Sequence, residues 1–403
     1  MKILFFDTWT KGIRNFSRLT DKLESKGCTY KLVHLESWDG VDVPKYQKIG
    51  KIDCYDISYY NSTYIYSVLK QERPDVVLML SLSYLLDRVI TSMCNKLGIK
   101  IVYLAHGKIY MKEGIGNLSS NLSLAEKINK RRSTKKMMII KNYFRFNLLT
   151  RFRPDLIFHT LLEFVNHSDK SMYTPYCSEF KVNAGMVYYE SEKEMFENER
   201  HFPKGMIQAV GNPEMDSIIN ARVIDKPEFL KSINFDRENY ALYMDDGFTQ
   251  EGLFSYEEWK SFINEVYVPL RKRGISLIIK LHPRTNVEPM NDFLKEQCIL
   301  AIKDVDFKNV CAHADFVLSH SSSTVMYGMI VNKPVLLPRW GKMTNLVRNY
   351  PEDAVTYVET LEDYASLVKN GIPHKDTSAY LKDNCGNLDG KAIDRIVEVI
   401  LSV

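Results

Sequence analysis

The stretch YALYMDDG (residues 240–247) predicts a buried strand that ends in two carboxylates and a glycine. Two later apolar runs end in a similar way, residues 275–281 before His282 and residues 316–319 before a serine-rich cluster. Helical patterns separate the three runs, and parallel strands that alternate with helices end at one edge of a sheet. We therefore expect the three polar clusters to converge in one crevice.

The first half of the chain shows the same alternation of strand and helix patterns. Its apolar runs lack the polar alternation of half-exposed strands, which indicates a parallel sheet covered on both faces and built from right-handed βαβ units. A length of 403 residues is typical of two domains. We predict an α/β protein with two Rossmann-like domains, residues 1–210 and 211–403, facing each other across a cleft.

The composition is that of a soluble globular protein, with 45% hydrophobic and 26% charged residues. A formal charge of +4 is too small to indicate a nucleic-acid binder. The seven cysteines are scattered, and none forms a CxxC pair, which argues against a zinc site or a disulfide framework. The apolar run at the N-terminus is too short for a signal peptide, and no run is long enough for a membrane span. We expect a cytoplasmic protein with reduced thiols.

Residues 126–153 depart from this pattern. They hold ten Lys or Arg and one acidic residue, mixed with aromatic and aliphatic side chains. A basic amphipathic helix of this kind binds an anionic membrane surface or an anionic acceptor, or it is a solvated helix docked by its apolar side. The pattern fits these interpretations equally, and a peripheral contact with the inner face of the plasma membrane is one of them.

Asp245, Asp246 and Gly247 are the first candidate site residues. Glycine permits a tight turn and a close approach of the backbone to a ligand. Two adjacent carboxylates repel each other, and one with a raised pKa suits a general base. A plain Asp-Gly turn is the alternative.

His282 stands in the sequence KLHPR, residues 280–284. Pro283 biases the residue before it toward an extended backbone, and the flanking Lys280 and Arg284 favour anions. An imidazolium at this strand end would bind a phosphate and protonate a departing oxygen. A structural histidine that caps the strand is the alternative.

The cluster His320, Ser321, Ser322, Ser323 and Thr324 lies between a strand and a helix that begins near Thr324. Free backbone N–H groups at a helix start bind phosphate, and serine hydroxyls add donors. Serine and threonine are also common N-caps, so a structural role stays open.

Three further residues complete the candidate set. Gly211 and Asn212 form the turn that leads into the second domain, and we count them among the donor-binding residues. His106, which ends the strand pattern of residues 99–105, would orient or deprotonate an acceptor hydroxyl, unless it is structural. We assign no metal ligands, since Asp306 in the Asp-Val-Asp stretch 304–306 suits a helix N-cap better.

The ordered motifs Asp245-Asp246-Gly247, Lys280-Leu281-His282-Pro283 and Ser321-Ser322-Ser323-Thr324 resemble those of bacterial sialyltransferases of the GT-B fold. The resemblance covers residues 211–340 and implies a GT-B fold whose C-terminal domain binds a CMP-activated donor. It implies that Asp246 or Asp245 is the general base, that His282 binds or protonates the donor phosphate, and that Ser322 and Ser323 hold it. Inverting transfer of a nonulosonic acid to a bacterial surface glycan, without a metal or other cofactor, would follow.

The chain is also similar to CDP-glycerol and related polyol-phosphate transferases of teichoic-acid and capsule synthesis. That similarity rests on His106-Gly107, Lys280-Leu281-His282-Pro283 and the serine cluster, and it implies that His106 is the base. UDP-GlcNAc 2-epimerase-like enzymes are a more distant third, since no clear glycine-rich uridine-phosphate loop is present. A non-catalytic glycan-binding protein of the same fold is the remaining alternative.

Overall fold

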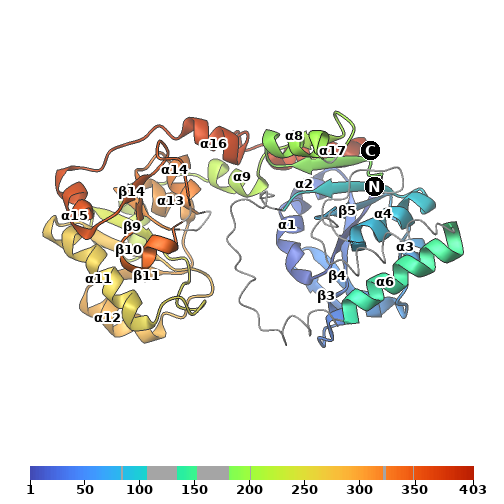
Figure 1. The fold of residues 1–403 in the computed structure, drawn as a ribbon, viewed down its shortest axis with the longest axis horizontal. Helices are drawn as coiled ribbons and strands as arrows, with labels where there is room; N and C mark the ends of the chain where they lie inside the picture. Colours follow the sequence, from blue (N-terminus) through green and yellow to red (C-terminus); the bar gives the residue numbers. More distant parts are fainter. Residues whose placement is uncertain (83–84, 107–133, 152–180, 200, 321–323, 348) are drawn as a thin grey trace. The chain divides into compact units, whose positions relative to one another are not determined.

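The computed structural model describes residues 1–82, 85–106, 134–151, 181–199, 201–320, 324–347 and 349–403 (Figure 1). The chain forms two compact units. The first unit comprises residues Met1–Pro213 and Cys385–Val403, and the second comprises Glu214–Asn384.

The first unit contains an eight-stranded sheet in the order β3-β4-β2-β1-β5-β6-β7-β8. All neighbouring strands are parallel except β3 and β4. The strands are β1 (Lys2–Asp7), β2 (Thr29–His34), β3 (Tyr46–Ile49), β4 (Ile52–Asp56), β5 (Val76–Met79), β6 (Lys100–Leu104), β7 (Ala184–Val187) and β8 (Ile207–Ala209).

Helices and short helical turns connect these strands. They are η1 (Thr10–Gly12), α1 (Ile13–Ser17), α2 (Thr20–Ser25), η2 (Glu36–Asp39), η3 (Ile57–Tyr60), α3 (Ile65–Glu72), α4 (Leu85–Leu97), α6 (Thr134–Phe146), the π-helical turn η4 (Asn147–Arg151), α8 (Glu190–Asn198) and the C-terminal α17 (Ala392–Ser402).

The second unit contains a six-stranded sheet in the order β11-β10-β9-β12-β13-β14, and all its strand pairs are parallel. The strands are β9 (Tyr240–Met244), β10 (Ser276–Lys280), β11 (Leu300–Ile302), β12 (Phe316–Leu318), β13 (Val335–Pro338) and β14 (Thr356–Val358). The helices and turns are α9 (Pro213–Asn220), α10 (Lys226–Ser232), α11 (Tyr256–Lys272), η7 (Glu288–Met290), α12 (Asn291–Glu296), α13 (Phe307–Ala312), α14 (Val325–Ile330), η8 (Gly341–Asn345), α15 (Leu361–Asn370) and α16 (Ser378–Cys385).

Both faces of the second sheet are buried, which explains why its strands show no polar alternation. On one face, Ala241 and Tyr243 of β9 pack with Trp259 and Ile263 of α11. On the other face, the hydroxyl of Tyr240 donates to the carbonyl of Val310 in α13. Helix α11 begins at a capping box, in which Ser255 and Glu258 satisfy each other's backbone N–H groups.

The strands predicted from residues 99–105, 240–247, 275–281 and 316–319 are confirmed to within a few residues, and the two-sheet α/β class is the observed one. The antiparallel edge was not predicted: Gly50, with φ of 58°, allows a tight turn between β3 and β4. The apolar run of residues 155–158 also predicts a strand, and it lies outside the described residues.

The predicted domain division at residue 210 differs from the structure at the C-terminus. Residues 385–403 return to the first unit, because α17 buries Ile396, Val397 and Ile400 in that unit's core. An amphipathic last helix can pack on either sheet, and its sequence does not say which. Within the described part of the chain, no helix has the length and apolar character needed to span a bilayer.

Because α17 packs in the core of the first unit, its buried residues should stabilise that unit. Ile396→Ala should lower the free energy of unfolding of the first unit by about 3 kcal/mol, since Ile396 is fully buried. Urea unfolding followed by circular dichroism measures this, with the exposed Glu398→Ala in the same helix as control. Destabilisation of the second unit instead would contradict the assignment.

Candidate active site

The first two polar clusters lie together at the carboxyl edge of the second sheet. Strand β9 pairs in parallel with β10 on one side and β12 on the other, so all three end at this edge. Met244 is aligned with Lys280, and the backbone N–H of Asp245 donates to the Lys280 carbonyl at 3.0 Å. The predicted convergence of Asp245 and His282 is thus confirmed.

Asp245 holds the loop that follows β10. Its Oδ2 accepts hydrogen bonds from the backbone N–H of His282 at 3.2 Å and from the hydroxyl of Thr285 at 2.5 Å. Asp245 and Thr285 are both buried. These hydrogen bonds position the loop and leave Asp245 less suited to accept a substrate proton, and its role as a base stays a prediction. Asp246, also buried, is the remaining carboxylate of the pair.

The ring of His282 lies against Gly247. A Cβ at Gly247 would come within 3.1 Å of Nδ1 of His282, and the φ of 76° there also favours glycine. Nδ1 of His282 accepts the backbone N–H of Arg284 at 3.2 Å. In the neutral ring the proton is therefore on Nε2, which makes Nε2 a hydrogen-bond donor.

Burial and the nearby Arg284 lower the pKa of His282 below its ordinary value. At neutral pH the ring is therefore neutral, and it donates through Nε2. The sequence had led us to expect an imidazolium, which requires the opposite shift. A neutral Nε2–H still binds a phosphate oxygen, as a hydrogen-bond donor without charge.

Two cations flank His282, and both already have partners within the protein. Lys280 donates to the carbonyl of Leu281 at 2.8 Å, and its Nζ lies 5.5 Å from the centre of the Phe307 ring. Burial lowers the pKa of Lys280. Arg284 is exposed beyond Pro283 and forms an ion pair with Glu251 at 2.6 Å.

His320 is a core residue, and its prediction as a donor-binding residue is wrong. Its side chain is fully buried, with ring centres of Tyr243, Phe248 and Phe262 between 5.4 and 5.9 Å away. Burial lowers the pKa of His320 to about 3, so the ring is neutral at physiological pH.

The serine cluster itself lies outside the described residues. Thr324 occupies the N-cap position of α14, as the pattern predicted, but its side chain does not cap the helix by a hydrogen bond. The roles of Ser321, Ser322 and Ser323 as phosphate ligands stay predictions.

Gly211 and Asn212 belong with the first unit, where the C-terminal segment covers them. A Cβ at Gly211 would lie 3.0 Å from Nη2 of Arg395 and 3.3 Å from Cβ of Ala392. Asn212 is buried, and its side chain hydrogen-bonds Tyr189. Arg395 and Ala392 thus account for a small residue at position 211, and the donor-binding role of Gly211 and Asn212 stays a prediction.

His106 lies at the carboxyl edge of the first sheet, exposed after β6. Its Nδ1 is 2.9 Å from the carbonyl oxygen of Leu80, which can only accept a hydrogen bond. In the neutral ring the proton is therefore on Nδ1, and Nε2 is an acceptor. This is the arrangement that a general base requires.

Asp7 is a candidate that sequence reasoning missed. It ends β1 at the same edge, and burial raises its pKa while the backbone N–H groups of Thr8 and Trp9 and the charge of His106 oppose the rise. A Cβ on Gly12 would overlap Oδ2 of Asp7, so a glycine is needed beside this carboxyl group. The signal was available, because β1 ends in an aspartate just as β9 does.

The Asp-Val-Asp stretch has the structural role that we favoured. Asp306 caps α13 by accepting the backbone N–H of Asn309 at 2.9 Å. Among the described residues, no cluster of three or more His, Cys, Asp or Glu side chains is arranged to hold a metal ion.

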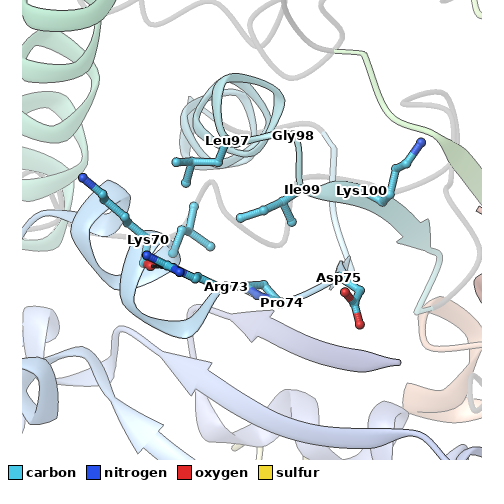
Figure 2. A pocket seen from close by; sticks show the side chains of 9 residues that line it. Lys70, Arg73, Pro74, Asp75, Leu97, Gly98, Ile99 and Lys100 are labelled. Carbon is cyan, nitrogen blue, oxygen red and sulfur yellow. Dashed lines mark hydrogen bonds between the residues drawn. The ribbon is translucent and has the colours of Figure 1, made fainter.

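Each of the two units contains a pocket. One of about 600 Å³ lies beside the end of β11 in the second unit, lined by Ala221, Arg222, Ile224, Phe229, Ser232, Ile233, Asp304, Val305, Asp306 and Asn309. The other, of about 560 Å³, lies where β5 and β6 begin in the first unit and is lined by Leu69, Lys70, Arg73, Pro74, Asp75, Leu97, Gly98, Ile99 and Lys100 (Figure 2). The second pocket is at the amino edge of its sheet, away from His106.

Comparison with known proteins identifies the fold. UDP-GlcNAc 2-epimerase from Methanocaldococcus jannaschii is similar over 100% of both chains, with a TM-score of 0.55 and 16% identity. The enzyme from Neisseria meningitidis bound to UDP-GlcNAc has a TM-score of 0.51 and 14% identity, again over 100% of both chains. The wall teichoic acid polymerase TagF, as its H444N variant, has a TM-score of 0.54 and 12% identity over 100% of this chain and 88% of that one.

No family model matches the sequence, and no curated protein matches it. Identities this low show the fold alone. The fold is GT-B, as the motif resemblance implied, and it is shared by the epimerases and by TagF.

The burial of His320 predicts a pH dependence of stability. The unfolded ring takes up a proton near pH 6.5 and the folded ring near pH 3, so the unfolded state gains protons first as the pH falls. Stability should thus fall by about 2 kcal/mol between pH 7 and pH 5 from this residue alone. In His320→Leu, the free energy of unfolding of the second unit, measured with urea, should fall by correspondingly less over the same pH interval. An equal loss in wild type and variant would contradict this account.

Proposed function

We propose that the protein is a transferase that moves a group from a cytidine-nucleotide donor to a glycan acceptor, with the donor phosphate at His282. The observation that carries the proposal is the His282 ring itself, packed on Gly247 and oriented so that Nε2–H is the available donor. A fixed donor beside a leaving phosphate stabilises the charge that develops there as the bond breaks.

The surroundings of His282 support a nucleotide in this place. The pocket of about 600 Å³ lies at the same sheet edge, after the end of β11, which is the neighbour of β10, and we propose that it takes the nucleoside. We also propose that Ser321, Ser322 and Ser323 contribute hydroxyl and backbone donors to the phosphate, as the motif resemblance implies. In this arrangement the second unit binds the donor and the first unit binds the acceptor.

Our first candidate donor is a CMP-activated nonulosonic acid. The acceptor hydroxyl oxygen attacks the anomeric carbon, the bond from that carbon to the phosphate oxygen breaks, and CMP departs with the bonding electrons. Asp246 takes the hydroxyl proton, and displacement from the opposite face inverts the anomeric centre. No metal is required in this scheme, because hydrogen-bond donors balance the phosphate charge.

The second candidate is transfer of a polyol phosphate from a CDP-activated donor, and the tautomer of His106 favours it. Nδ1 of His106 is tied to the Leu80 carbonyl, which leaves Nε2 to accept a proton from an acceptor hydroxyl. The engagement of Asp245 by Thr285 and by the His282 backbone also reduces the support for a base from the Asp-Asp-Gly motif. The hydroxyl oxygen would then attack the β-phosphorus, with CMP as the leaving group.

Release of CMP distinguishes the donors. Incubation with CMP-sialic acid and with CDP-glycerol, each with EDTA present, should release CMP from one of them. His282→Ala should lower that rate roughly 100- to 1,000-fold, because the phosphate loses a fixed donor. His374→Ala, an exposed histidine of the same unit, is the matched control. Cytidine nucleotide binding without turnover, or an unchanged rate in His282→Ala, would contradict the proposal.

The base is tested by one variant of each candidate. His106→Asn retains a donor for the Leu80 carbonyl and removes Nε2, whereas Asp246→Asn removes only the charge. With a CMP-activated nonulosonic acid we expect Asp246→Asn to lose most of the activity, roughly 100-fold or more. With a CDP-activated polyol we expect that loss in His106→Asn. Full activity of both variants on the donor that is used would exclude both assignments.

A further inference from the structure

Helix α6 carries apolar residues on two opposite sides. Tyr143 and Phe146 are buried in the core of the first unit, and the side chain of Asn142 joins them by accepting from the backbone N–H of Ile65 at 2.8 Å and donating to the carbonyl of Thr63 at 2.8 Å. The helix packs beside α4, and through Asn142 it contacts Ile65, the first residue of α3 (Figure 1). This side of the basic segment is thus a docked face, as one of the sequence interpretations held.

The opposite side is apolar and exposed. Positions 137, 141, 144 and 148 follow one another at intervals of four, three and four residues, which places them on one face of a helix. Met137 is 50% exposed and Leu148 is 52% exposed on that face, and the next residue, Leu149, is 71% exposed. Three large apolar side chains within thirteen residues form a ridge with no covering element among the described parts of the chain.

The charge beside this ridge has one sign. Residues 134–151 contain no Asp or Glu. Lys141 is exposed within the ridge, and the exposed Arg145 lies with its guanidinium 4.1 Å from the centre of the Tyr64 ring. An apolar ridge flanked by cations complements a bilayer with anionic headgroups, where acyl chains take the apolar residues and phosphates take the cations.

We propose that the ridge of Met137, Leu148 and Leu149, with Lys141 within it, lies in the headgroup region of an anionic lipid surface, with α6 parallel to the membrane plane. This contact does not depend on which donor the protein uses. The contact places the carboxyl edge of the first sheet, where we propose that the acceptor binds, close to lipid. Lys135 in the first turn of α6 pairs with Asp39 at 2.7 Å, and its Nζ lies 3.4 Å from the carbonyl oxygen of Thr8. Strand β1 ends at that edge. A lipid-linked acceptor would reach it from the membrane over a distance of about the length of α6.

Vesicle flotation of the full chain tests the proposal. The protein should float with phosphatidylcholine vesicles that contain phosphatidylglycerol, much less with phosphatidylcholine alone, and less at high salt. Leu148→Ser/Leu149→Ser should lower the partition coefficient about tenfold or more, since the apolar contact is lost. Lys141→Gln should weaken binding to the anionic vesicles only.

Two control variants match these changes. Val41→Ser/Val223→Ser removes two exposed apolar side chains elsewhere, and Lys26→Gln/Lys96→Gln removes two exposed charges elsewhere. Both should float like the wild type. No flotation at all, or flotation that Leu148→Ser/Leu149→Ser leaves unchanged, would overturn the proposal. Analytical ultracentrifugation tests a second copy of the chain as the occupant. A dimer that Leu148→Ser/Leu149→Ser dissociates, with flotation unchanged, would assign the ridge to that copy instead.

Discussion

The candidate site depends on the hydrogen bonds of one buried carboxylate. Asp245 accepts from the His282 backbone and from the Thr285 hydroxyl, and its own backbone N–H continues the ladder between β9 and β10. Loss of these donors would leave a buried acceptor unsatisfied, at a cost of about 1–3 kcal/mol. The carboxylate thereby fixes where the loop after β10 turns and where the His282 ring stands.

The two histidines at the sheet edges are held in opposite tautomers by the same kind of contact. A backbone carbonyl keeps the proton of His106 on Nδ1, whereas a backbone N–H keeps the proton of His282 on Nε2. The first ring presents an acceptor and the second a donor. A transfer reaction needs both functions, one for the attacking hydroxyl and one for the departing phosphate.

Much of this could be predicted from the sequence. Buried parallel strands consist of uninterrupted apolar residues, so the bounds of β9 and the carboxyl-edge position of Asp245 and His282 followed directly. The role of His320 did not follow, since a histidine after a strand looks alike whether it faces a ligand or the aromatic side chains of Tyr243 and Phe262. The contact of Gly211 with Arg395 joins residues far apart in sequence, and no local pattern reveals it. Asp7 was overlooked for the simpler reason that no motif surrounds it.

The tautomer of His282 is the central claim, and nitrogen NMR measures it most directly. In protein labelled with ¹⁵N-histidine, with the signal assigned by comparison with His282→Ala, we predict a neutral ring protonated on Nε2 at pH 7. Addition of CMP should then shift the Nε2 resonance more than the Nδ1 resonance. An imidazolium at pH 7, a proton on Nδ1, or a spectrum that CMP leaves unchanged would contradict the account.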